Sequence, residues 1–183
     1  GLVGSEMCIR DRLNTELGIP FRTPAEGHNV AFTSLWDNYP DSLEIPLKGK
    51  ASRAYLLMAG STNHMQCHID NGVIRIYYKD GTRDVMFLRN PDNWPPIEHI
   101  FFEDGLAFNR HTPALYRLRL KTGEISNNFG EELGFPGASR ELDGGAAVLL
   151  EMPLNPGKKL SHLVLETLSN DVVIGLMSIT LQR

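Results

Sequence analysis

Residues 73–88 read VIRIYYKDGTRDVMFL, two apolar and β-branched runs separated by a Lys-Asp-Gly-Thr tetrapeptide. Runs of this composition are typical of strands, and Asp-Gly between them favours a β-hairpin. We expect a type I′ turn centred on Asp80 and Gly81, because glycine adopts positive φ without steric cost and aspartate tolerates it. Val73 and Ile74 would lie on opposite faces of the first strand. Apolar groups on both faces favour a place inside a β-sandwich.

Strand signals recur along the rest of the chain, separated by turn sequences rich in Gly, Pro, Asn and Asp. In the strand expected at 114–120, Leu118 and Leu120 would face the interior. Arg117 and Arg119 would then face the solvent. The sequence predicts an all-β protein, an antiparallel β-sandwich of jelly-roll type with about nine or ten strands. The expected strands are 30–36, 42–47, 54–59, 73–78, 84–88, 97–102, 114–120, 146–152, 160–167 and 172–181.

The remaining segments set the expected domain boundaries. Residues 122–143 are polar and glycine-rich and are expected to form a long loop, with at most a short helix at 131–133. No linker divides residues 13–183, which we expect to form one domain. Residues 1–12 read GLVGSEMCIRDR and resemble a translated sequencing adapter, so we expect a non-native, disordered segment. Cys67 would then be the only native cysteine.

Composition narrows the class of partner. The chain has 183 residues, with 18 Lys and Arg against 22 Asp and Glu, and a net charge of −4. Basic residues form no cluster, so we expect no nucleic-acid partner. No apolar run approaches the roughly 18 residues that a membrane span needs, so we expect no membrane-spanning segment.

The sequence carries no recognisable catalytic signature. It has no phosphate-binding glycine loop and no Gly-x-Ser-x-Gly motif, so we expect no cofactor and no catalytic residue. The densest group of metal-ligand types is HMQCH, from His64 to His68. In a strand these histidines would lie about 13 Å apart, too far for one ion. We therefore expect no metal site, and keep as an alternative a small metal-dependent sandwich enzyme that uses His64, His68 and His99.

Aromatic residues with polar neighbours are the stronger candidates for a binding site. Sugar recognition combines an aromatic surface with a few placed amide and carboxylate groups. The simpler interpretation, which we favour, is that the two tryptophans plug the ends of the sandwich while the polar residues form turns. The candidate carbohydrate site comprises Trp36, Asp37, Asn38, Tyr39, Asp92 and Trp94.

Several segments together resemble a known domain. They are FTSLWDNYPD at 32–41, AYLLMAGSTN at 54–63, YKDGT at 78–82 and LRNPDNWPPIE at 88–98. They resemble the C-terminal β-sandwich of a family of large bacterial proteins similar to six-hairpin glycosidases, in which β-sandwiches flank an α/α toroid. The closing segments MPLNP and ETLSNDVVIGL resemble the last strands of galactose-binding-type jelly rolls in such enzymes.

This resemblance implies carbohydrate processing outside the cytoplasm, in the periplasm or after secretion. In the related enzymes the catalytic acid and base lie in the toroid, so it assigns no catalytic residue to this chain. We expect a non-catalytic accessory β-sandwich that packs against an upstream catalytic domain of the same parent chain, with a further contact to glycan. The parent protein would be a glycoside hydrolase. The main alternative is a carbohydrate-binding module that uses Trp36, Tyr39 and Trp94.

Overall fold

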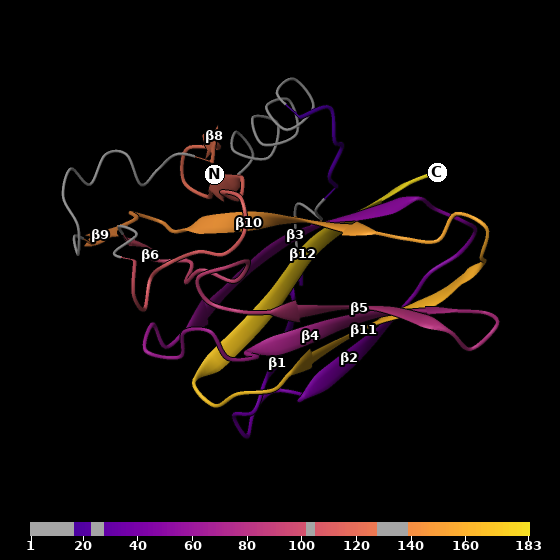
Figure 1. Cartoon of the computed structure of the whole chain (residues 1–183), viewed down its shortest axis with the longest axis horizontal. Helices are drawn as coiled ribbons and strands as arrows, with labels where there is room; N and C mark the ends of the chain where they lie inside the picture. The colour runs from indigo at the N-terminus through magenta and orange to yellow at the C-terminus, as the bar shows by residue number, and fades with distance from the viewer. Residues whose placement is uncertain (1–16, 23–27, 102–104, 128–138) are drawn as a thin grey trace.

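The computed structural model describes residues 17–22, 28–101, 105–127 and 139–183, which form an all-β structure (Figure 1). No helix occurs among these residues. Two strands, Ile125–Ser126 (β8) and Ser139–Glu141 (β9), lie inside 122–143, where the sequence predicts a loop with at most a short helix. The strands are β1 (Ala31–Ser34), β2 (Ser42–Pro46), β3 (Arg53–Thr62), β4 (Gly72–Tyr78), β5 (Arg83–Leu88), β6 (His99–Phe101), β7 (Arg117–Arg119), β8 (Ile125–Ser126), β9 (Ser139–Glu141), β10 (Ala146–Pro153), β11 (Leu160–Thr167) and β12 (Val172–Gln182).

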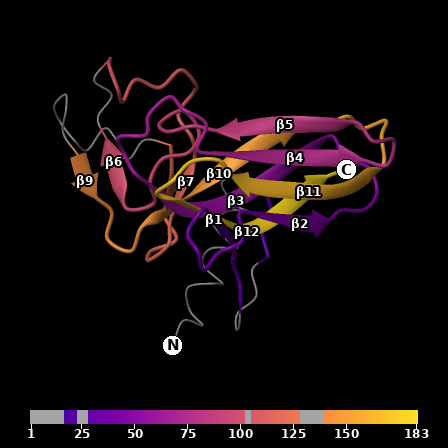
Figure 2. The same cartoon turned by 90° about the horizontal axis from the view of Figure 1, so that it is seen from below.

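Two antiparallel sheets pack against each other (Figure 2). The six-stranded sheet has the order β1-β12-β3-β10-β7-β8, and the four-stranded sheet has the order β2-β11-β4-β5. The short strands β6 and β9 pair separately. The predicted fold class, an all-β antiparallel sandwich, is confirmed.

Apolar side chains from both sheets fill the space between them. Ile74 and Ile76 of β4 are fully buried there, together with Leu56 and Met58 of β3. Val73, on the other face of β4, is also fully buried, so apolar groups lie on both faces as expected. Arg75 and Tyr77 on that second face are only partly buried, so β4 is completely covered on its inner face alone. Burial of one such side chain contributes about 1.5–3 kcal/mol to the free energy of folding, so the interior of the sandwich is the main source of stability.

The β4–β5 hairpin forms as predicted, but its turn is of another type. Only Gly81, at φ 84°, has a positive φ in this turn, so the prediction of a type I′ turn was wrong. The Gly81 N–H donates to the Tyr78 carbonyl at 3.1 Å, and the Tyr78 N–H donates to the Thr82 carbonyl at 2.9 Å. This is a type I turn followed by a glycine bulge. The Asp80 carboxylate accepts from the Thr82 N–H at 3.0 Å, and that bond holds Asp80 in its place before the bulge.

Strand β7 inverts the predicted alternation. Leu118 is buried, but it packs in a second apolar cluster on the outer face of the six-stranded sheet. Arg117, expected in solvent, is only 8% exposed. It pairs in register with Val148, a residue of the interior core. The prediction failed because both faces of this sheet are covered, and alternation alone does not say which one faces the interior.

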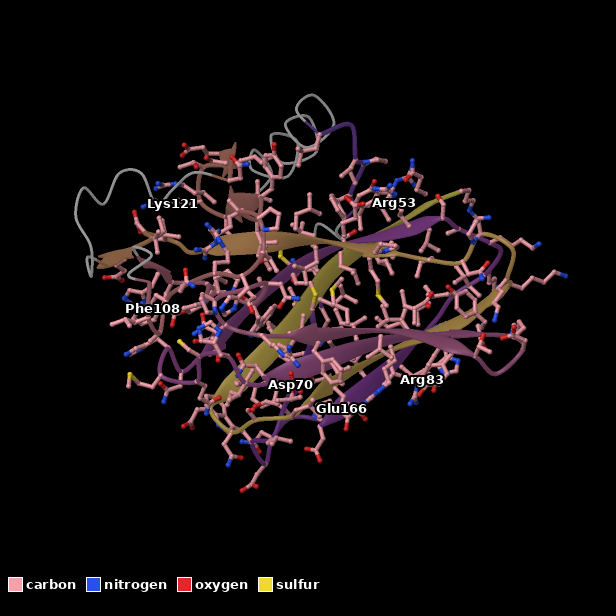
Figure 3. The ribbon with its side chains drawn as sticks, viewed as in Figure 1. Arg53, Asp70, Arg83, Phe108, Lys121 and Glu166 are labelled. Carbon is pink, nitrogen blue, oxygen red and sulfur yellow. The ribbon has the colours of Figure 1, made fainter. Side chains whose placement is uncertain are left out.

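The two outer faces of the sandwich differ in character. Leu17, Ile19 and Phe21 join the second apolar cluster, so residues 17–22 cover part of the outer face of the six-stranded sheet. The outer face of the four-stranded sheet is mixed: an Arg75–Glu166 ion pair and a Tyr77–His162 ring stack lie there together with the exposed Val85 and Phe87 of β5. Figure 3 shows Arg83 and Glu166 on this side and Arg53 on the opposite side of the molecule.

Two predictions concern residues outside the described part of the chain. The disordered non-native segment at 1–12 and the short helix at 131–133 both lie there. Within the described part, the structure contains no apolar helix of the length that a membrane span requires.

Candidate functional site

Four connections between strands gather at one end of the sandwich, which we call the loop end: 35–41, 63–71, 89–98 and 168–171. Figure 1 shows this end opposite the β4–β5 hairpin. Backbone hydrogen bonds join the connections. The Asn63 N–H donates to the Asp171 carbonyl at 3.1 Å, and the His68 N–H donates to the Asn90 carbonyl at 2.7 Å. The connections 63–71, 89–98 and 168–171 are therefore joined to one another, and 35–41 is joined to the end of β11 by the Thr167 N–H, which donates to the Asp41 carbonyl at 2.9 Å.

Trp36 and Tyr39 lie together on this surface. The Tyr39 N–H donates to the Trp36 carbonyl at 3.0 Å, so the two residues begin and end one tight turn. Trp36 is 51% exposed and Tyr39 is 39% exposed. Their ring centroids lie 6.3 Å apart with the planes at 62°. Asp37 and Asn38, between them, are exposed as well. We call these four residues the aromatic patch.

Trp94 lies elsewhere and is not available to a ligand. It is 0% exposed and belongs to the interior core. Its ring packs so closely on Gly60 that a Cβ there would lie 2.7 Å from the ring Cζ2 atom. The prediction of Trp94 as part of a binding surface was therefore wrong. The favoured interpretation that tryptophan plugs the sandwich holds for Trp94 but not for the exposed Trp36.

Asp92 also lies apart from the aromatic patch, beside two histidines. Its Oδ1 atom accepts a hydrogen bond from the His111 backbone N–H at 2.7 Å and lies 3.4 Å from the His111 Nδ1 atom. The His68 and His111 ring centroids lie 4.8 Å apart. One ligand atom from each of the three residues lies within 4.8 Å of the others. We call these residues the His–Asp–His group.

The structure does not assemble the alternative metal set expected from the sequence. Among the described residues, the His–Asp–His group is the only cluster of three ligand-type residues close enough to share an ion. His68 belongs to it, whereas His64 and His99 do not. His111 could not be identified from the sequence, because it lies in an irregular segment that reaches Asp92 only through tertiary packing.

A buried guanidinium holds the adjoining segment in place. Arg117 donates to the carbonyls of Pro96 at 2.8 Å and of His99 at 2.9 Å. Burial lowers the pKa of Arg117 to about 10, and the nearby Glu98 carboxylate opposes that effect. Arg117 therefore stays charged at neutral pH. Its hydrogen bonds hold the backbone of residues 96–99 in place, so the role of Arg117 is structural.

Comparison of the chain with protein-family models, curated proteins and solved structures gave no match. The function of the chain is therefore inferred from the fold, the side-chain geometry of the loop end and the resemblance of its sequence segments.

Proposed function

We propose that this chain is a non-catalytic accessory β-sandwich of a glycoside-hydrolase-like protein, and that it contacts glycan through the aromatic patch. The observation that carries this proposal is the exposed pair Trp36 and Tyr39, flanked by Asp37 and Asn38. A sugar ring has an apolar face that packs on an aromatic ring, while carboxylate and amide groups bind its hydroxyls. Aromatic rings, a carboxylate and an amide all lie within one short turn here.

The surroundings of the patch support a contact with an upstream catalytic domain of the same parent chain. Further apolar side chains of the loop end are exposed to between 36% and 77%: Leu35, Met65, Ile69 and Leu168. Single exposed apolar residues are ordinary, but a group of them on one end of a domain is typical of an interaction surface. Ligand sites often lie at domain boundaries, so a glycan on the patch would lie next to the catalytic domain. The same proposal places the protein in the periplasm or outside the cell.

Isothermal titration with plant and host polysaccharides tests the glycan contact. We expect saturable binding by the wild-type chain and a loss of at least about tenfold in affinity for Trp36→Ala, equivalent to about 1.4 kcal/mol. Tyr116→Ala is the matched control, because Tyr116 is an aromatic residue 40% exposed next to β7, which lies toward the opposite edge of the six-stranded sheet from β1 and the aromatic patch. Absence of wild-type binding to every polysaccharide, or an equal loss in Tyr116→Ala, would contradict the proposal. Hydrolysis of aryl glycosides by the isolated chain would contradict its non-catalytic part.

A further inference from the structure

We propose that His68, Asp92 and His111 bind one divalent transition-metal ion, with Zn²⁺ as the representative ion. The three residues come from separate segments of the chain, the β3–β4 connection, the β5–β6 connection and the irregular segment before β7. An ion held by all three would link these segments across the loop end. This proposal does not depend on the glycan contact.

The distances suit a shared ion. Zinc binds histidine nitrogen and carboxylate oxygen at about 2.0–2.2 Å, so two ligand atoms of a tetrahedral site lie about 3.4 Å apart. The Asp92 Oδ1 and His111 Nδ1 atoms already lie 3.4 Å apart. All three ligand atoms lie within 4.8 Å of one another, so a side-chain rotation of His68 toward this pair completes a three-ligand set.

Backbone contacts hold the group in position. The Asp92 carboxylate accepts the His111 N–H at 2.7 Å, and the Asp92 carbonyl accepts the Thr112 hydroxyl at 2.7 Å. The His68 N–H donates to the carbonyl of Asn90, a fully buried residue. His68 itself has φ 57°, a left-handed conformation that residues other than glycine seldom adopt and that is concentrated at functional sites.

The ligand chemistry selects the class of ion. Two imidazoles and one carboxylate suit Zn²⁺ and its transition-metal neighbours, whereas Ca²⁺ and Mg²⁺ prefer sets of oxygen ligands. His68 and His111 are exposed, so water can complete the coordination on the solvent side. The guanidinium of Arg89 is close enough to Asp92 to interact with it electrostatically, but its ion pair is with Asp70 at 2.5 Å. The ion would act as a cross-link that fixes the segment carrying His111 to the sandwich.

Zinc titration of the chelator-treated full chain tests the proposal. We expect one saturable Zn²⁺ site by calorimetry and no comparable Ca²⁺ site. Zinc at about 100 times the dissociation constant should raise Tm by roughly 5–10 °C, and a chelator should reverse the shift. His68→Ala, His111→Ala and Asp92→Asn should each weaken zinc binding by at least about tenfold. His28→Ala is the matched control, because His28 is exposed and lies outside the group.

The same variants distinguish zinc binding at the His–Asp–His group from zinc binding elsewhere on the chain. Asp92→Asn keeps an oxygen that can accept the His111 N–H, and a circular dichroism spectrum like that of the wild type confirms that it folds. His111→Ala removes a side chain that is 62% exposed, so it should leave the fold intact. Absence of saturable zinc binding by the wild type would overturn the proposal. Equal losses in His28→Ala, or losses in His64→Ala and His99→Ala without a loss in His111→Ala, would overturn it as well.

Discussion

The two tryptophans of this chain occupy opposite environments, and their substitution should separate stability from recognition. Trp94 is 0% exposed in the core, whereas Trp36 is 51% exposed on the loop end. Trp94→Ala leaves a large cavity and should lower the free energy of unfolding by about 3–5 kcal/mol. Trp36→Ala should change it by less than about 0.5 kcal/mol. Urea unfolding followed by circular dichroism measures both values. Similar losses in the two variants would contradict the assigned environments.

Single residues also mark where sequence reasoning stopped. The run from Trp36 to Tyr39 could be identified as a candidate site, because tryptophan and tyrosine stand beside Asp and Asn in a turn sequence. Trp94 has a similar polar neighbourhood, and nothing in that neighbourhood says that its ring turns inward. Trp94 lies in the β5–β6 connection, and its ring packs on Gly60 of β3, which is distant in sequence. Contacts of this kind are set by tertiary packing, which local composition does not encode.

At the scale of elements, the β4–β5 hairpin is tied to the β10–β11 connection through one phenol. The Tyr78 hydroxyl donates to the Asp84 carboxylate and accepts from the Asn155 N–H at 2.8 Å. Burial, with the Asp84 hydrogen bond as the second cause, raises the pKa of Tyr78 to about 12. In an unfolded chain that pKa is about 10, so the folded state holds the proton more tightly. The stability from this difference is complete below about pH 10 and is lost as pH rises through about 12.

Tyr78→Phe tests this linkage. The variant should lose about 1–2 kcal/mol at neutral pH, because it leaves the Asn155 N–H and the Asp84 carboxylate without this partner. It should also show a shallower fall in unfolding free energy between about pH 10 and pH 12. Denaturant titrations of both proteins at several alkaline pH values give the two curves. Parallel curves would show that Tyr78 does not contribute to the alkaline loss of stability.

Elements were predicted best where one local rule was sufficient. The hairpin and the long strands follow from apolar runs bounded by turn residues, and these predictions are confirmed. The prediction of the turn type failed because a type I turn with a glycine bulge uses the same Asp-Gly pair. The prediction of which face of β7 points inward failed because the six-stranded sheet is covered on both faces, partly by residues 17–22. Such coverage depends on segments distant in sequence, so periodicity within one strand cannot reveal it.

At the scale of the whole molecule, the fold separates three surfaces with different properties. The outer face of the six-stranded sheet is apolar and partly covered. The outer face of the four-stranded sheet carries ion pairs and a ring stack. The loop end carries the aromatic patch and the His–Asp–His group, supported by both sheets. Sequence reasoning could predict the sandwich and the Trp36–Tyr39 part of the loop end. The His–Asp–His group arises only when the loops pack together, so the pairing of Asp92 with His111 was missed.

Nuclear magnetic resonance of the two indole N–H groups tests the central claim, the glycan contact at the loop end, most directly. The chain contains only Trp36 and Trp94, so their two indole signals report on the patch and on the core. During titration with a polysaccharide fragment that binds in calorimetry, the Trp36 signal should shift saturably and the Trp94 signal should stay in place. An unchanged Trp36 signal at saturating fragment, or a shift of the Trp94 signal alone, would contradict the account.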